Sequence, residues 1–168
     1  MKTRILIFVL ILTASASFAQ QDAQFTQYMY NTINVNPAYA GSRGVMSIFG
    51  LHRTQWVGLD GAPVTNALSL NTPINNSNIG IGLSAINDRI GPTVENTLSV
   101  DVSYTVQTSE TYKLSFGVKG TGNFFNLDAS KLNPLVDNDP SLVNYNKFSP
   151  NVGAGVYLHS DKSYVGVS

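Results

Sequence analysis

Apolar and polar residues alternate along two neighbouring segments in the middle of the chain. In residues 94–106 the even positions are apolar apart from Asn96, and the odd positions are polar. Residues 112–118 repeat this alternation, and the polar segment 107–111 lies between the two. A period of two residues predicts β-strands, and a polar turn between two such runs predicts a hairpin.

The same pattern recurs on both sides of this hairpin. It is clear at 79–85 and 151–158, and shorter candidates lie at 45–55, 64–71 and 163–168. Turn-forming residues such as Gly58–Pro63 and Asn87–Pro92 separate the runs. No long segment after the first twenty residues has helical spacing. The pattern predicts a single all-β domain of about seven strands joined in series.

Composition indicates which face of the strands is the outer one. Charged residues make up 12% of the chain, about half of the usual ~25%. A soluble β-sandwich, which is the alternative, would carry many Lys and Glu residues on its polar outer face. Here that face is mostly Gly, Ser, Thr and Asn. The pattern favours an antiparallel up-and-down transmembrane β-barrel of the outer-membrane type, with apolar residues facing lipid and about 10 residues per crossing.

The N-terminus has the features of an export signal. Lys2 and Arg4 precede an apolar run at 5–12, and Ser17–Ala19 forms a small-x-small cleavage site. The apolar run is too short to cross about 30 Å of hydrocarbon as a helix. We therefore expect residues 1–19 to be a signal peptide and the mature chain to begin at Gln20.

Several other classes of site are not supported by the sequence. The chain has no cysteine, which excludes a disulfide scaffold and a thiolate metal site. Basic residues are not clustered, so no nucleic-acid surface is expected. His52 and His159 match no HExxH motif, and no GxSxG motif is present. The segment 137–142 lacks the glycine of a calcium-binding loop. We expect no catalytic residue, cofactor or metal, and no enzyme.

Glycines recur in the strand that follows the central turn. Residues 117–122 carry three of them, but the segment continues a strand and opens no helix, so a phosphate-binding loop is not expected. Glycines within a strand allow large groups to pack closely across the sheet. We expect them to serve that purpose here.

Four charged residues lie on the polar face of the central hairpin and are candidates for the lumen wall: Glu95, Asp101, Lys113 and Lys119. If the numbers of paired residues sum to 220, Asp101 faces Lys119, and a sum of 218 makes the two diagonal neighbours. They could contact a transported or plugging segment. Alternatively, they could neutralise each other in a wet lumen, which we favour because solvated pairs contribute only ~0–1 kcal/mol.

Two stretches near the N-terminus resemble a known family: "QFTQYMYNTINVNPAYAGSRG" and "GLHRTQWVGLDGAPVTNALSLNTPI". They are similar to the start of the type IX secretion system membrane proteins of the PorP/SprF family. The resemblance continues through Asn87–Pro92, Tyr112–Gly117 and the segment from Tyr157 to Ser168. The motifs are short, but their order and spacing cover essentially the whole mature chain.

The resemblance implies a function, which the alternation of apolar and polar residues cannot indicate. Members of this family are outer-membrane β-barrels of Bacteroidetes-type bacteria that support export of cargo proteins, including gliding adhesins. Their implied partners are periplasmic ring or peptidoglycan-linked components and the C-terminal domains of the cargo. The resemblance implies no enzymatic activity and places the chain in the cell outer membrane.

The resemblance also suggests a role for the segment before the strands. Residues 20–42 contain only one charged residue, Asp22. We expect them to form a plug-like or periplasmic leader anchored on the barrel by Tyr28, Tyr30, Asn36 and Tyr39, because exposed tyrosines are costly in water. A disordered leader is the alternative. The remaining residues, 43–168, would form the strands.

The length of the chain and one loop raise further expectations. Family members are longer, and about seven strands are fewer than the smallest membrane barrels have. We therefore expect an incomplete N-terminal part of a barrel. The polar segment 126–147 is long enough to be an extracellular loop. It could bind a partner, or it could be an insertion that the fold tolerates. Alternative functions are a channel or transporter for a small or hydrophobic solute, and a secreted soluble adhesin domain.

Overall fold

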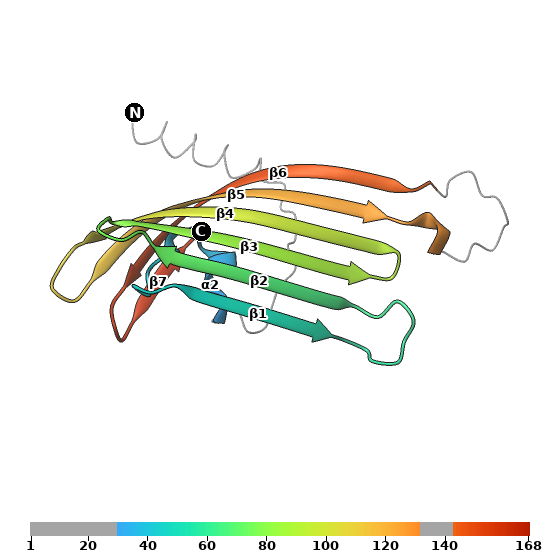
Figure 1. The fold of residues 1–168 in the computed structure, drawn as a ribbon, viewed down its shortest axis with the longest axis horizontal. Coiled ribbons are helices and arrows are strands. Elements are labelled where there is room, and N and C mark those ends of the chain that lie inside the picture. The colour runs from blue at the N-terminus through green and yellow to red at the C-terminus, as the bar shows by residue number, and fades with distance from the viewer. Residues whose placement is uncertain (1–29, 132–142) are drawn as a thin grey trace, which may run out of the picture.

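A single curled, antiparallel sheet dominates the computed structural model, which describes residues 30–131 and 143–168. The seven strands follow one another in chain order. They are β1 (Ser47–Thr54), β2 (Val64–Pro73), β3 (Ile79–Ile90), β4 (Thr93–Gln107), β5 (Lys113–Leu127), β6 (Tyr145–His159) and β7 (Tyr164–Val167). Figure 1 shows the sheet curving like half of a barrel. The predicted all-β, up-and-down architecture is confirmed.

The strands are longer than their hydrophobic alternation suggests. Pairing between β3 and β4 continues through Asn87, Asp88 and Arg89, and pairing between β5 and β6 extends to Leu127 and Tyr145. The expected loop at 126–147 is therefore too long, since its ends belong to strands. Alternation fails to mark these strand ends because both faces are polar at 87–89, and because the adjacent Phe124 and Phe125 put aromatic rings on both faces of β5. The strand pairing continues through both segments.

The two faces of the sheet differ in burial. On β4 the apolar side chains of Leu98, Val100 and Val102 are about half exposed, whereas Asp101 and Ser103 are completely buried. The apolar side chains therefore point away from the concave face, as predicted. The apolar residues with the least exposed surface among those described, Ile33, Ala38 and Ala40, belong to the segment before β1.

The connections differ in length at the two ends of the sheet. At one end the turns 74–78, 108–112 and 160–163 are short, and the N-terminal segment enters β1. At the other end lie the nine residues 55–63, the two-residue turn 91–92 and the two ends of the long connection between β5 and β6. Strands β1 and β7 are the two edges of the sheet.

Some expectations fall on residues that the structure does not describe. These are the signal peptide at 1–19, the proposed anchor Tyr28, and residues 132–142 of the long connection. Among residues 30–131 and 143–168, no helix is both long enough and apolar enough to cross a membrane.

Candidate functional site

The segment 30–44, which we call the strap, lies against the concave face of the sheet. It contains the short helix α2 (Thr32–Val35) and the 3-10 turn η2 (Pro37–Tyr39). Asn36 begins this turn, since its side-chain oxygen accepts a hydrogen bond from the Ala38 backbone N–H at 2.9 Å. Pro37 has the fixed backbone angle that suits the first position of a turn. The strap is therefore a folded peptide.

Asn36 also connects the strap to the last two strands. Its amide nitrogen donates to the Val156 carbonyl at 3.0 Å and, more weakly, to the Val167 carbonyl at 3.4 Å. Only 4% of Asn36 is exposed. One buried side chain thus shapes the turn in the strap and anchors it to β6 and β7.

Asp101 and Lys119 form a buried ion pair beneath the strap. The two residues face each other across β4 and β5, which is the register in which the residue numbers sum to 220. Lys119 Nζ lies 3.3 Å from the Asp101 carboxylate, and the two side chains are 13% and 0% exposed. The pair is thus far less solvated than we expected from the sequence.

Lys119 contacts the strap as well as Asp101. Its ammonium group donates to the Ile33 carbonyl at 2.8 Å and to the Asn34 carbonyl at 3.0 Å. Together with the Asp101 carboxylate, the two carbonyl groups give the ammonium group three oxygen partners. Lys119 therefore pairs with Asp101 and also binds the strap, so the ion pair and the contact with another segment, which we treated as alternatives, are both present.

Neutral side chains hold the strap along its length. Ser103 donates to the Ala40 carbonyl at 2.6 Å, and Ser69 donates to the Asn31 side chain at 2.7 Å. The ring of Tyr39 packs edge-on against Tyr157 with centroids 5.6 Å apart. The contacts of the strap therefore reach from β2 to β7.

Glycines allow the strap backbone to approach the sheet. A Cβ atom on Gly80 would overlap the Ala40 carbonyl, and one on Gly117 would overlap the backbone at Ala38. At Gly82 and Gly155 a Cβ atom would instead overlap strap side chains, those of Ile33 and Asn36. Gly80, Gly117 and Gly155 lie in one register row, which also includes Ser103.

This finding corrects part of our expectation for the glycines in 117–122. Gly122 does lie below a large side chain, because a Cβ atom there would be 3.2 Å from the Phe148 ring. Gly117 instead accommodates the main chain of the strap. In the sequence, Gly117 stands out only as a glycine on the polar side of a strand. That position does not show that the strap packs against it until the strand register is known.

The other candidate residues lie away from the buried pair. Glu95 accepts a hydrogen bond from Asn123, and its position lies six residues before Asp101 in β4. Lys113 begins β5 at the opposite end, opposite Gln107 and His159. The side chain of Tyr30 is largely exposed, at 72%. Asp101 and Lys119 thus lie beneath the strap, and Asn36 and Tyr39 of the strap contact the last strands. Glu95 and Lys113 lie elsewhere on the sheet, and Tyr30 is an exposed residue at the start of the strap.

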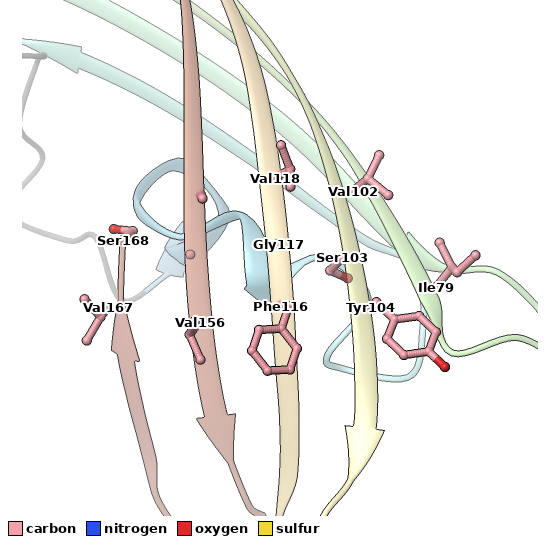
Figure 2. Close-up of a pocket in the computed structure, with 12 residues that line it drawn as sticks. Ile79, Val102, Ser103, Tyr104, Phe116, Gly117, Val118, Val156, Val167 and Ser168 are labelled. Atoms are coloured by element: carbon pink, nitrogen blue, oxygen red, sulfur yellow. The ribbon is translucent and has the colours of Figure 1, made fainter.

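A shallow apolar hollow of about 790 Å³ lies where β3 to β7 run side by side. In Figure 2 the blue strap passes behind these strands, while the rings of Tyr104 and Phe116 lie in front. Val102, Val118 and Val156 complete much of its lining. Such a lining suits hydrocarbon chains rather than polar substrates.

The described ends of the long connection are held together by hydrogen bonds. The Ala129 N–H donates to the Asn144 side chain at 2.8 Å. Ser130 donates to Asp128 at 2.6 Å, and this bond, helped by the nearby Lys131, lowers the pKa of Asp128 below its usual value. In the described part of the chain, no three His, Asp or Glu residues lie close enough to hold a metal ion.

Comparison with known proteins gives one match. The family model described as "Type IX secretion system membrane protein PorP/SprF" matches residues 17–168. No curated protein and no solved structure matches the chain. The match extends over the strap and all seven strands.

Proposed function

Because the chain belongs to the PorP/SprF family of type IX secretion system membrane proteins, we propose that it supports the export or surface attachment of cargo proteins. Gliding adhesins are the cargo class that we infer. In this proposal the chain is exported by the signal peptide at 1–19 and acts in the outer membrane. Its partners are periplasmic ring or peptidoglycan-linked components and the C-terminal domains of the cargo.

The reversed polarity of the sheet is the observation that carries this proposal. Its outer face is aliphatic and exposed, while its inner face is polar and covered by the strap. Outer-membrane barrels have this arrangement, because lipid surrounds their outer face and water or a plug fills the lumen. Family membership then supplies the secretion system in which such a barrel acts.

We assign the strap the role of an internal plug. It enters β1 at the end of the sheet opposite the long connection between β5 and β6, and the end without long loops is the periplasmic end of outer-membrane barrels. Asp101 and Lys119 line the lumen below it, and Asn36 and Tyr39 anchor it. A plug at the periplasmic mouth would be the first part of the barrel that a periplasmic partner meets.

Deletion of the gene tests the proposed function. We expect the deletion strain to lose a set of secreted and surface proteins that carry a shared C-terminal domain, and the intact gene to restore them. The protein should also be recovered together with periplasmic secretion components. An unchanged set of secreted and surface proteins, combined with impaired uptake of a solute, would favour the channel or transporter instead.

A further inference from the structure

The apolar band on the outer face ends at a row of hydrogen-bonded polar side chains. His52, Asn66, Asn87 and Asn96 are register partners on β1 to β4. The side chains are linked in order by contacts of 2.7, 3.4 and 2.8 Å. We call these four residues the amide row. It lies on the same face as Leu68, Leu83 and Leu98, whose side chains are more than half exposed.

The amide row has a defined direction and a free end. Asn66 donates to Asn87, and Asn87 donates to Asn96. The amide nitrogen of Asn96 has no acceptor within the part of the chain that the structure describes. The last member of the row therefore offers N–H donors at the surface, beside β5.

Arg89 adds a positive charge to this edge of the band. It faces outward from β3 opposite Val94, is exposed, and has no acidic partner among the described residues. Arg89 and Asn96 are diagonal neighbours on adjacent strands, close enough for long side chains to share one ligand. An outward arginine costs about 2–4 kcal/mol at the bilayer midplane but only ~0–1 kcal/mol near the interface.

The neighbouring strands support the same membrane boundary. In the same register row, β5 and β6 carry Phe124 and Phe148, whose ring centroids are 4.9 Å apart. Aromatic rings gather at the headgroup level of membrane barrels. From Asn96 to Gln107, β4 extends about 37 Å, which a tilt of about 45° converts to roughly 26 Å of membrane depth. The amide row at one border and Tyr112, just beyond the other end of β4, thus enclose a band close to the usual height of ~25 Å.

We propose that the amide row and Arg89 bind the phosphate group of a membrane lipid. The guanidinium supplies a fork of donors suited to phosphate, and Asn96 supplies further N–H groups at the border of the apolar band. At this end of the sheet β5 ends at Leu127 and β6 begins at Tyr145, and the long connection joins them. Long loops of membrane barrels are extracellular, so this end is the outer-leaflet side. This site rests on the proposed membrane placement, but not on any role in secretion.

Lipid retention by the purified protein tests the site. The intact protein and its Arg89→Gln variant are extracted in mild detergent and mixed with phosphatidylglycerol, and native mass spectrometry counts the lipids that remain bound. We expect Arg89→Gln to weaken retention about tenfold, as for the loss of one hydrogen bond to a charged group. Arg89→Lys should retain most of the binding, because it keeps the charge.

Arg53 provides a matched control on the other face. It lies at the same end of the sheet, opposite Thr65 on the inner side, so Arg53→Gln should leave retention unchanged. Digalactosyldiacylglycerol, which lacks phosphate, should be retained about tenfold less than phosphatidylglycerol. Equal retention of the two lipids, or equal losses in Arg89→Gln and Arg53→Gln, would overturn the proposal. If Arg89→Gln does not fold, Asn96→Ala replaces it, with a several-fold loss expected.

The lipid-retention experiment tests the site independently of the gene-deletion experiment. A gene deletion that leaves the secreted proteins unchanged would remove the proposed function, while phosphate-dependent lipid retention would still support the site. Conversely, a deletion strain that loses secreted proteins, combined with no difference in lipid retention between the Arg89 and Arg53 variants, would remove only the site.

Discussion

The two faces of β4 are built from alternate residues of one segment, yet they are covered in different ways. On the inner face, Asp101 and Ser103 are fully buried because the strap and the neighbouring strands surround them. On the outer face, Val100 and Val102 keep about half of their surface exposed. Among the described residues, the polar face has the protein's own cover and the apolar face has none.

This contrast reverses the usual arrangement of a soluble sheet. Burying polar groups is costly unless hydrogen bonds replace those lost to water, and the strap supplies such bonds to Lys119, Ser103 and Ser69. Exposing an aliphatic face to water is also costly. Lipid removes that second cost, so the difference between the faces is what a membrane barrel requires.

Substitution of the buried Asp101–Lys119 pair on the inner face should cause the largest loss of stability. Lys119→Met leaves Asp101 buried without its partner and removes two hydrogen bonds to the strap. We expect a loss of about 3–5 kcal/mol in the free energy of unfolding. Urea titration, followed by the change in gel migration between folded and heat-unfolded protein, measures this loss.

Lys147→Met is the control for that substitution. Lys147 is an exposed lysine in β6, and its replacement should change stability by less than about 0.5 kcal/mol. Similar urea midpoints for the two variants would mean that the inner pair does not hold the strap in place.

A charge in the centre of the outer face should have the next largest effect. Val102 lies well inside the apolar band, and Val102→Arg should destabilise the folded protein in membranes by about 2–4 kcal/mol. Val94→Arg, on the same face but beside Arg89 at the border, should cost only ~0–1 kcal/mol. Equal yields of membrane-assembled protein for the two variants would contradict a lipid-facing band.

Two glycines in β5 compare the covered and uncovered faces directly. A Cβ atom at Gly117 would collide with the strap backbone, whereas one at Gly120 meets nothing within 4 Å. Gly117→Ala should therefore cost about 1–3 kcal/mol through overpacking. Gly120→Ala should be neutral or slightly stabilising, because glycine weakens a strand interior.

Protease sensitivity provides a second measurement for the same pair. Displacement of the strap by Gly117→Ala should speed cleavage between residues 30 and 44, and Gly120→Ala should not. Identical cleavage rates and urea midpoints would show that the strap does not depend on the glycine row.

The smallest expected effect comes from one hydrogen bond to the strap. Ser103→Ala removes the donor to the Ala40 carbonyl without adding volume. We expect a loss of about 0.5–1.5 kcal/mol in the free energy of unfolding, measured by the same urea titration. A loss as large as that of Lys119→Met would mean that charge is not the main link between strap and sheet.

Much of the sheet could be predicted because its alternation is a local property. The even positions of 94–106 are apolar, so the outward side chains, the strand and its hairpin partner all follow from a period of two. The sequence also limited Asp101 and Lys119 to two possible registers. Strand ends such as Asn87–Arg89 escaped prediction, because polar residues on both faces carry no alternation.

The contacts of the strap could not be predicted because they join distant parts of the chain. Lys119 lies 86 residues from Ile33, and Asn36 lies 120 residues from Val156. Polar and aromatic residues in the leader indicated that it was held somewhere, but not which carbonyls or glycines received it. Only the curvature of the sheet brings these groups together.

Lipid access along β4 tests the central claim most directly. Single cysteines, introduced one at a time from Leu98 to Ser103 into a chain that has none of its own, carry spin labels in reconstituted membranes. The account predicts that labels at 98, 100 and 102 collide readily with oxygen dissolved in lipid, and that those at 99, 101 and 103 do not. Collision rates without this alternation, or with the odd positions facing lipid, would contradict a sheet whose apolar face meets the membrane and whose polar face holds the strap.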